Sequence, residues 1–287
     1  MKDLDWTILQ LFLHVARTGG LSGAARLTGL SPATVGRHML DLEGAVGRPL
    51  FLRSQTGYRL TEEGEMLLGH LGEMEGGARL VEDWRSRTAG RSLVRIACGT
   101  WFAWWLAQNL GAIIGRDDSF QLDLVIGESR ARLAHRESDI GLRAVRPTEE
   151  NLAAVKLGPV AYAAYRAGGG GADGEQDWVA VSRPNALSRY LMYPHAEAAG
   201  RIAATVSTPR AMADLAGAGL GRAVLPCFVG DLDPRLQRAG GEIPALRHTQ
   251  WLVMNNDDRH RPEIRLVADR MIGLVRRQAS LFAGQSV

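Results

Sequence analysis

The sequence predicts an α/β protein that begins with an all-α winged helix-turn-helix domain and continues into two α/β lobes. Three observations predict this fold. Two short helical patterns flank a glycine turn between residues 21 and 46, and a heptad pattern follows from residue 67 to 81. From residue 93 onward, strand patterns alternate with helical patterns. A chain of 287 residues, 46% of them hydrophobic, can form two or three domains with their own cores.

The first three helices are marked by their capping residues. Asp5 can cap a helix that runs through residue 18, and Ser22 is expected to open a second, shorter helix. Gly29 then supplies the turn, because glycine readily adopts the left-handed backbone that ends a helix. Ser31 can cap a third helix with Pro32 at its first position, where no N–H is needed. This order of helix, glycine turn and capped helix is typical of a helix-turn-helix motif.

The third helix has one buried face and one face that is free for recognition. Four apolar residues from Val35 to Val46 recur at steps of four, three and four, which places them on one inward stripe. The opposite face is the one that a recognition helix presents to the major groove of DNA. Arg37 can bond a guanine or a phosphate, and Thr34 can touch a thymine methyl group. The predicted DNA contacts from this helix are Ser31, Pro32, Ala33, Thr34, Arg37 and His38.

A hairpin pattern follows the third helix. Residues 49–52 and 58–60 resemble two short strands around a polar tip, which is the form of a wing. A wing suits the phosphate backbone or the adjacent minor groove, so Arg53, Thr56 and Arg59 are predicted to position the DNA. Residues 1–61 carry seven Lys or Arg against four Asp or Glu, a net charge of about +3. Positive charge is therefore concentrated where DNA would bind.

A long helix is predicted after Thr61, which can cap it. Its apolar residues alternate steps of four and three, a heptad seam that has no partner within the helix itself. We therefore expect this helix to pair two chains, with a helix folded against its own domain as the alternative. Four glycines between residues 69 and 77 each cost about 1 kcal/mol relative to alanine, so the helix should depend on close packing. The predicted dimer contacts are Leu67, Leu71, Met74, Ala78 and Val81.

Beyond a break in the periodicity around residues 88–92, strands and helices alternate, which indicates a mainly parallel sheet. A glycine run at residues 168–171 separates a second unit of the same kind. The predicted strands are residues 93–98, 120–126, 139–142, 178–181, 202–206, 222–225 and 251–254, and the predicted helices are residues 101–114, 186–193, 210–216 and 264–277.

Two α/β lobes joined by two crossings of the chain are the architecture of periplasmic binding proteins. In that architecture, strand ends and helix starts from both lobes converge on a small-molecule site. The predicted boundaries are residues 1–61 for the winged helix-turn-helix domain, 62–91 for the dimerisation helix and hinge, and 92–287 for the effector domain. Within the effector domain, the predicted first lobe comprises about residues 92–165 and 255–287, and the second lobe about residues 166–254.

The residue pattern argues against an enzyme and against a metal site. The seven histidines are scattered without metal-ligand spacing, and no Gly-x-Ser-x-Gly elbow occurs. The glycine-rich segment 217–221 runs from helix to strand, whereas a dinucleotide loop runs from strand to helix. Cys98 and Cys227 are too few for a disulfide framework, so we expect both to be buried and reduced. A redox role for Cys227 is the minor alternative.

Two parts of the sequence carry motifs of a known family. The block FLHVARTGGLSGAARLTGLSPATVGRHMLDLE, the segment GRPLF-x-R and the closing LTEEGE resemble the N-terminal domain of LysR-type transcriptional regulators. The segments ESDIGLRAVRP, GLGRAVLPCFVGDLDPRL and WLVMNNDDRHRPEIRLVADRM are similar, more loosely, to the effector domain of one branch of that family. The resemblance implies a regulator that binds a double-stranded DNA operator and a small-molecule effector. It also implies a homodimer or homotetramer, with RNA polymerase as a further partner to consider and no cofactor.

By analogy with that family, the effector lies among the loops after the first two strands and a helix start in the second lobe. Hydroxyls and free N–H groups at helix starts can bind a carboxylate or phosphate, and Arg143 can pair with a carboxylate. The aromatic residues around Trp101 suggest an aromatic or apolar effector. Two alternatives stay open, because Thr100 and Ser207 can cap their helices and Arg143 can join a salt bridge. The predicted effector contacts are Thr100, Trp101, Ser129, Arg143, Ser207 and Thr208.

The alternative function is that of a solute-binding or catalytic α/β protein with an appended helical domain. Such a protein would bind or convert its substrate without DNA, so a test of binding to the DNA beside its own gene separates the two. The sequence shows no apolar run of about 18 residues and no secretory signal pattern, so we expect a cytoplasmic protein that does not span a membrane.

Overall fold

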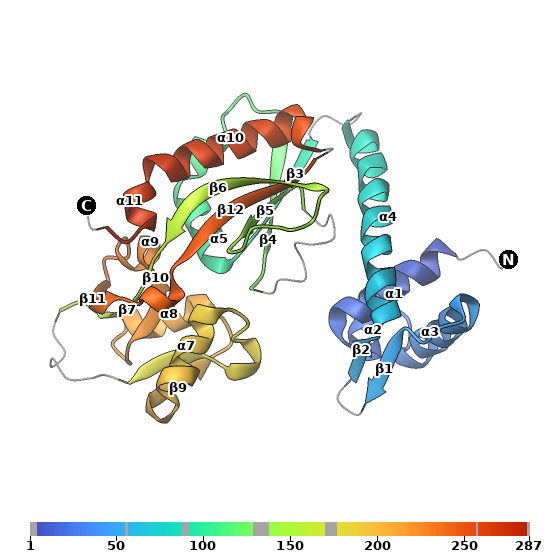
Figure 1. Ribbon diagram of the computed structural model, residues 1–287, viewed down its shortest axis with the longest axis horizontal. Helices are drawn as coiled ribbons and strands as arrows, with labels where there is room; N and C mark the ends of the chain where they lie inside the picture. Colours follow the sequence, from blue (N-terminus) through green and yellow to red (C-terminus); the bar gives the residue numbers. More distant parts are fainter. Residues whose placement is uncertain are drawn as a thin grey trace. The chain divides into compact units, whose positions relative to one another are not determined.

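The structure of the protein is a computed structural model that describes residues 5–54, 57–87, 92–128, 138–169, 177–256 and 258–285. The chain divides into two compact units, Met1–Glu82 and Asp83–Val287, and Figure 1 draws both as ribbons. The first unit contains most of the long helix that the sequence assigned to a separate linker. The predicted hinge at residues 88–91 lies outside the described residues.

The first unit consists of three helices, a hairpin and a long helix. Its elements are α1 (Trp6–Thr18), α2 (Leu21–Thr28), α3 (Pro32–Val46), β1 (Phe51–Ser54), β2 (Gly57–Leu60) and α4 (Glu62–Arg87). Asp5 caps α1 as predicted, because its carboxylate accepts a hydrogen bond from the N–H of Thr7 at 2.9 Å.

The prediction that Ser22 opens the second helix was wrong. α2 begins at Leu21, and its cap is Gly20, which makes no side-chain capping bond. Gly19 ends α1 with a left-handed φ of 70°, and the extended Gly20 leads directly into α2, so Ser22 lies inside the first turn. The close packing of the two helices requires a glycine at Gly23, since a Cβ there would lie 2.4 Å from the side chain of Thr18.

α3 has the cap and the buried stripe that the sequence predicts. Ser31 Oγ accepts a hydrogen bond from the N–H of Thr34 at 3.1 Å, which fixes the start of the helix. Val35 and Met39 are fully buried, and Leu42 is 2% exposed. Burying this stripe against α1 and α2 leaves the opposite side of α3 free.

The hairpin is anchored in the core of the first unit. β1 and β2 pair antiparallel from Phe51 opposite Leu60 to Ser54 opposite Gly57, so the first strand begins two residues later than predicted. The reason is that the N–H groups of Leu50 and Phe51 donate to a carboxylate oxygen of Glu43. Residues 55 and 56, at the tip, lie outside the described part of the chain.

α4 is capped by Thr61, whose Oγ1 accepts a hydrogen bond from Gly64 N at 3.0 Å. The predicted dimer seam on this helix is divided in two. Leu71 is 1% exposed and belongs to the core of the first unit, and Leu67 packs against that core. Leu71 is therefore not available to a second chain, whereas the half-buried Leu67 is only partly covered. The heptad pattern alone does not tell an intrachain contact from an interchain contact.

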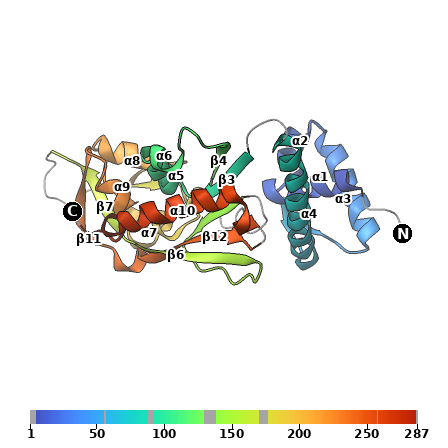
Figure 2. The same ribbon diagram turned by 90° about the horizontal axis from the view of Figure 1, so that it is seen from above.

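The first lobe of the second unit contains a five-stranded sheet in the order β4-β3-β5-β12-β6. β3, β4 and β5 are parallel, whereas β12 runs antiparallel to both β5 and β6. α10 packs along this sheet in Figures 1 and 2, with one apolar side buried. The elements are β3 (Ser92–Cys98), α5 (Thr100–Gln108), α6 (Leu110–Ile113), β4 (Phe120–Ile126), β5 (Ile140–Arg143), β6 (Leu152–Val160), β12 (His248–Asn255), η5 (Asp258–His260) and α10 (Pro262–Arg277).

The second lobe contains a sheet in the order β10-β7-β11 and a parallel pair, β8 and β9. A single parallel bridge between Trp178 and Arg222 connects the pair to β10. The elements are β7 (Tyr162–Ala167), β8 (Trp178–Val181), η2 (Arg183–Asn185), α7 (Arg189–Glu197), η3 (Ala199–Arg201), β9 (Ile202–Val206), α8 (Pro209–Gly217), β10 (Ala223–Pro226), α9 (Cys227–Gly230), β11 (Leu236–Glu242) and η4 (Pro244–Leu246), and α11 (Ala279–Phe282) follows α10 at the end of the chain.

The predicted lobe boundaries need correction at both crossings. β7 was assigned to the first lobe, yet it pairs with β10 and β11 of the second. β12 was assigned to the second lobe, yet it pairs with β5 and β6 of the first. The crossings therefore lie between Val160 and Tyr162 and between Glu242 and His248, because only sheet pairing decides to which lobe a strand belongs.

The sequence also misplaced several elements. It missed β6, β7 and β11, and it extended one helix across Asn109, where α5 ends and α6 begins. Asn109 breaks the helix because its side chain donates to the carbonyl of Trp105 at 2.8 Å. Six of the seven predicted strands, at 93–98, 120–126, 139–142, 178–181, 202–206 and 222–225, are confirmed to within one residue, and the seventh, 251–254, lies inside the longer β12.

Candidate functional site

The free side of α3 presents one continuous, exposed face. Ala33, Arg37, Leu40 and Gly44 are spaced at steps of four, three and four, opposite the buried stripe, and all are exposed. Arg37 makes no hydrogen bond or ion pair to the described part of the chain. Its guanidinium is therefore available to an outside acceptor such as a base edge or a phosphate.

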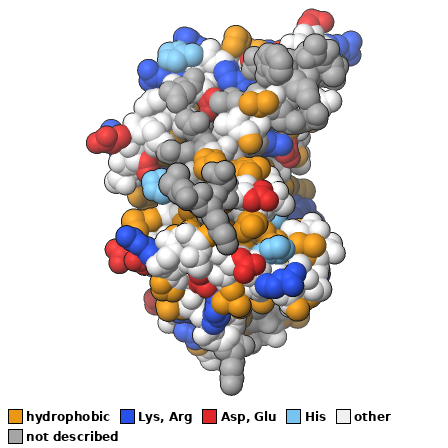
Figure 3. Space-filling view, turned by 90° about the vertical axis from the view of Figure 1, so that its right-hand side faces the viewer, with side chains coloured by type: hydrophobic (Ala, Val, Ile, Leu, Met, Phe, Trp, Pro, Cys, Tyr) orange, Lys and Arg blue, Asp and Glu red, His pale blue; other side chains and the backbone are white. Residues whose placement is uncertain are grey.

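Leu40 is a residue of this face that the sequence prediction omitted. Its side chain is 54% exposed in the middle of the face, one turn beyond Arg37. Its spacing of seven residues from Ala33 could have placed Leu40 on this face from the sequence alone. The prediction considered mainly polar or small side chains there and so omitted a large apolar one. Figure 3 shows that exposed hydrophobic side chains also lie beside Lys and Arg side chains elsewhere on one face of the molecule.

The other predicted DNA contacts on α3 differ in their solvent exposure and in their hydrogen bonds within the protein. Pro32 and Ala33 are exposed, and His38 is half-buried. The hydroxyls of Ser31 and Thr34 lie 2.8 Å apart and share a hydrogen bond. Ser31 therefore acts first as the helix cap, and its hydroxyl reaches DNA only in addition to that role.

In the hairpin, Arg53 is engaged by the protein itself. Its guanidinium hydrogen-bonds the carboxylate of Glu43 on α3 and lies 5.8 Å from the ring centre of Tyr58. The same Glu43 accepts the N–H groups that start β1. Glu43 thus ties the wing to the recognition helix, a role that the sequence prediction did not assign. Arg59 is exposed, and Thr56 lies outside the described residues.

The exposed half of the predicted dimer seam lies beyond the core of the first unit. Met74 is 51% exposed, Val81 is 64% exposed and Ala78 is also exposed. Met66, 52% exposed, adds a further exposed apolar side chain near the start of the helix. The Arg17 guanidinium bonds both carboxylate oxygens of Glu75, at 3.1 and 2.6 Å, which ties this part of α4 to α1.

In the second unit, the start of α5 is occupied by a carboxylate of the protein. The N–H of Thr100 donates to Glu128 Oε1 at 3.0 Å, and the hydroxyl of Tyr190 donates to Glu128 Oε2 at 3.4 Å. The cap of α5 is Gly99, so the alternative that Thr100 caps this helix was wrong. The backbone N–H of Thr100 is thus taken by Glu128 in this structure, whereas the contact of Thr100 with an effector stays a prediction.

Trp101 is buried beside this contact. It is 4% exposed, and its Nε1 has no hydrogen-bond partner among the described residues. Trp105 on the same helix is fully buried and donates to Gln278 at 2.7 Å, which makes it a core residue. Ser129, the next predicted contact, lies outside the described part of the chain.

The other predicted effector residues have partners within the protein. Arg143 bonds Glu149 at 3.0 Å and is 14% exposed, which fits the salt-bridge alternative. Thr208 caps α8 by accepting from the N–H of Ala211 at 3.4 Å, whereas Ser207 is exposed and uses its carbonyl to accept from Asn185.

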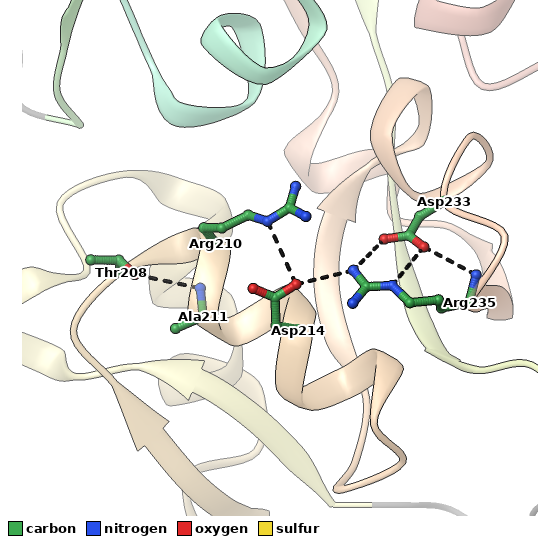
Figure 4. Close-up of polar contacts among 6 residues, drawn as sticks. All are labelled: Thr208, Arg210, Ala211, Asp214, Asp233 and Arg235. Carbon is green, nitrogen blue, oxygen red and sulfur yellow. Dashed lines mark hydrogen bonds and ion pairs between the residues drawn. The ribbon is translucent and has the colours of Figure 1, made fainter. Parts of the chain in front are cut away.

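The start of α8 lies beside an exposed network of ion pairs (Figure 4). Arg235 bonds Asp233 at 2.7 Å and Asp214 at 3.0 Å, and Arg210 lies 3.5 Å from Asp214. The hydrogen bond from Arg235 lowers the pKa of Asp233 below its usual value. The charges of this network balance one another, so it stabilises the lobe surface more than it attracts a charged ligand.

Both cysteines are buried and free. Burial, followed by the charge of Glu128, raises the pKa of Cys98 to about 12, and burial raises the pKa of Cys227. Both shifts favour the protonated thiol over the nucleophilic thiolate at neutral pH. Within the described residues, no group of three His, Cys, Asp or Glu side chains is arranged to hold a metal ion, and no helix is long and apolar enough to span a membrane.

Two family models match the chain. The model described as bacterial regulatory helix-turn-helix protein, lysR family, matches residues 6–65. The model described as LysR substrate binding domain matches residues 87–275, which is more than half of the chain. The two matches follow the division into a helical first unit and a two-lobed second unit.

The chain is also similar to curated regulators. It is 27% identical over 162 residues to the HTH-type transcriptional regulator PtxR of Pseudomonas aeruginosa, a match that covers 55% of this chain and 51% of PtxR. It is 24% identical over 297 residues to the Mau operon transcriptional activator of Paracoccus denitrificans, with 99% of this chain and 100% of that protein covered. Apart from that full-length match, the chain spans about half the length of curated relatives such as PtxR or less.

Solved structures with a comparable fold are available. Full-length CbnR in complex with its target DNA has a TM-score of 0.54 at 18% identity, and the likeness covers 96% of this chain and 99% of CbnR. ArgP from Mycobacterium tuberculosis has a TM-score of 0.53 at 18% identity, with 95% and 98% of the two chains covered. At this identity the likeness shows the fold alone.

Proposed function

Because this chain belongs to the LysR family of bacterial regulatory helix-turn-helix proteins, we propose that it is a transcriptional regulator that binds a double-stranded DNA operator and responds to a small-molecule effector. The observation that carries the DNA-binding part is the exposed face of α3. Arg37 is held there on a rigid helix and makes no bond to the described protein. A guanidinium presented in this way can bond a guanine edge or a phosphate in the major groove.

The regulator acts as a dimer in this proposal. Met74, Ala78 and Val81 expose apolar surface on the outer half of α4, and Leu71 anchors the inner half in the first unit. A second copy of α4 would bury the exposed half and place two recognition helices on the two halves of a palindromic operator. The homotetramer and a contact with RNA polymerase are further parts of the proposal that rest on the family.

The second unit senses the effector in this proposal. An effector changes the arrangement of the two lobes only as far as its affinity for the two arrangements differs. The change would pass to the DNA-binding units through the dimer and alter their spacing. The proposal assigns no catalytic step and no cofactor to the protein, and it places the protein in the bacterial cytoplasm, with its operator.

The decisive experiment measures binding of the full-length chain to DNA. Fluorescence anisotropy should show that one fragment from the region flanking its own gene binds more tightly than fragments of equal length from inside that gene. The affinity should fall with increasing salt, because bound phosphates release their counterions. Mass photometry of the specific complex should show an even number of chains on each operator.

Equal and weak binding of all fragments at low salt would contradict the proposal. In that case, a ligand bound without any effect of DNA would favour the solute-binding alternative.

A further inference from the structure

Among the residues that the structure describes, Glu128 is a partly buried carboxylate without a cationic partner. It follows β4 in the first lobe, and its two oxygens accept from the N–H of Thr100 and the hydroxyl of Tyr190. Both donors are neutral. Within the described residues, no Lys, Arg or His forms an ion pair with it, and it makes no further hydrogen bond. A carboxylate removed from water favours a cationic partner.

Aromatic rings surround this carboxylate. Trp101, Tyr162 and Tyr190 are each less than 9% exposed, and the rings of Tyr162 and Tyr190 stack with their centres 5.2 Å apart. Burial is the main cause that raises the pKa values of Tyr162 and Tyr190, and the negative charge of Glu128 is the second. The carboxylate therefore lies close enough to act on both tyrosines. The faces of aromatic rings attract cations and do not attract anions.

We propose that the effector of this regulator is a cation, a small molecule whose ammonium, amidinium or guanidinium group binds Glu128 at the edge of the aromatic cluster of Trp101, Tyr162 and Tyr190. The inference rests on the proposed function, because it names the ligand class of the same effector domain. An anionic effector is disfavoured at this position, since it would meet the like charge of Glu128 where solvent screens little.

The position of the cluster links the ligand to lobe movement. Glu128 and Trp101 come from the first lobe, whereas Tyr190 lies on α7 of the second. Tyr162 and His248, whose rings lie 5.7 Å apart, are the first residues of strands that follow the two crossings. A cation that takes the place of the Tyr190 hydroxyl on Glu128 breaks a hydrogen bond between the two lobes. It would thereby change the free-energy difference between two arrangements of the lobes, one with this hydrogen bond and one without it.

The test uses the full-length protein and pairs of compounds that share a skeleton but differ in charge. Benzamidine is compared with benzoate, and 1,4-diaminobutane is compared with succinate. Thermal unfolding and tryptophan fluorescence report binding. At least one cation should raise the melting temperature and change the fluorescence at millimolar concentration, whereas its paired anion should do neither.

Glu128→Gln should weaken binding of that cation by about ten- to a hundredfold, the loss expected for a hydrogen bond between two charges. Glu197→Gln, on the exposed end of α7, removes the same charge away from the cluster and should leave the affinity unchanged. If Glu128→Gln fails to fold, Glu128→Asp keeps the charge, and it should retain a weakened preference for the cation.

Binding of the anions alone, or of none of the cations, would overturn the inference. Unchanged cation binding in a folded Glu128→Gln variant would overturn it too. An operator gel shift on the same preparation separates this failure from failure of the proposed function, because a protein that still binds its operator but ignores every cation contradicts only the ligand class.

Discussion

The DNA-binding face of the first unit and the Glu128 cluster of the second are built in opposite ways. All residues of the proposed DNA-binding face come from one helix, α3, and two of them, Arg37 and Leu40, are exposed. The cluster draws Trp101, Glu128 and Tyr190 from three separate segments and keeps its aromatic residues buried.

This difference separates two kinds of site. A face on one helix follows from a period of 3.6 residues, so each position can be inferred from its neighbours in the sequence. A cluster between lobes exists only after distant strands have paired. Substitutions in the first unit should therefore divide cleanly into core and surface effects, whereas substitutions in the cluster should affect binding and lobe arrangement together.

The largest expected effect sharpens the division within α4. Leu71→Ala should lower the free energy of unfolding of the first unit by about 2–5 kcal/mol, because Leu71 is 1% exposed and its truncation leaves a cavity. Met74→Ala, on the 51% exposed residue one turn away, should change the unfolding free energy by less than about 0.5 kcal/mol and weaken the dimer instead. Denaturant unfolding and sedimentation measure the two quantities, and equal losses of stability would refute the division of the seam.

The next effect tests the exposed face. Arg37→Ala should reduce operator discrimination by about 1–3 kcal/mol if the guanidinium bonds a base. If it bonds only phosphate, binding should weaken evenly on all sequences, and the slope of affinity against salt should become shallower. Arg276→Ala, an exposed arginine on α10, is the matched control for charge and should leave both quantities unchanged. Unchanged operator affinity in Arg37→Ala would remove this residue from the DNA-binding face.

A smaller effect is expected from Leu40, whose exposed side chain can contact a thymine methyl group. Replacing the contacted thymine by uracil removes only that methyl group, and this should weaken binding by about 0.8 kcal/mol, or roughly fourfold. In Leu40→Ala, the same change from thymine to uracil should have no effect. A uracil effect that persists in Leu40→Ala would show that another residue reads the methyl group.

The smallest effect concerns Asp118 in the second unit. Unlike Glu128, this carboxylate has a cationic partner among the described residues, Arg270. A hydrogen bond from Arg270 is the main cause that lowers the pKa of Asp118, and Gly115 N also donates to it. The pKa of Asp118 in the folded protein therefore lies below its value in the unfolded chain, so the ionised carboxylate stabilises the fold. This stabilisation is fully present above the unfolded pKa, and it is lost as the pH falls through the folded pKa.

Asp118→Asn should therefore lower the denaturant midpoint slightly at neutral pH. The difference from the wild type should shrink under acidic conditions, as the wild-type carboxylate becomes protonated. A difference that stays constant with pH would show that the charge of Asp118 does not contribute.

Most of the first unit could be predicted from local signals. The caps at Asp5, Ser31 and Thr61 and the buried stripe of α3 follow the sequence. The exception at Ser22 arose because Gly19 and Gly20 allow α2 to begin earlier than a serine cap would. In the second unit, the strands rich in β-branched residues were found, but β6, β7 and β11 were missed because glycine, proline or alanine interrupts their pattern.

The candidate sites show the same limit. Arg37 could be inferred as a DNA contact because helical spacing places it on the face opposite the core. The family resemblance placed the loops of Thr100 and Glu128 at one effector site, but the hydrogen bond between the two residues could not be inferred, because 28 positions separate them in the chain and no local pattern links them.

The sequence by itself determined the order of the domains and the direction in which the recognition helix faces, because caps, turns and periodicity act over a few neighbouring residues. Its motifs also resembled those of the LysR family. Only the tertiary structure decided which half of the α4 seam is buried, which lobe holds β7 and β12, and that a carboxylate lies at the start of α5. These features depend on contacts between residues far apart in the chain, which form only when the sheets assemble.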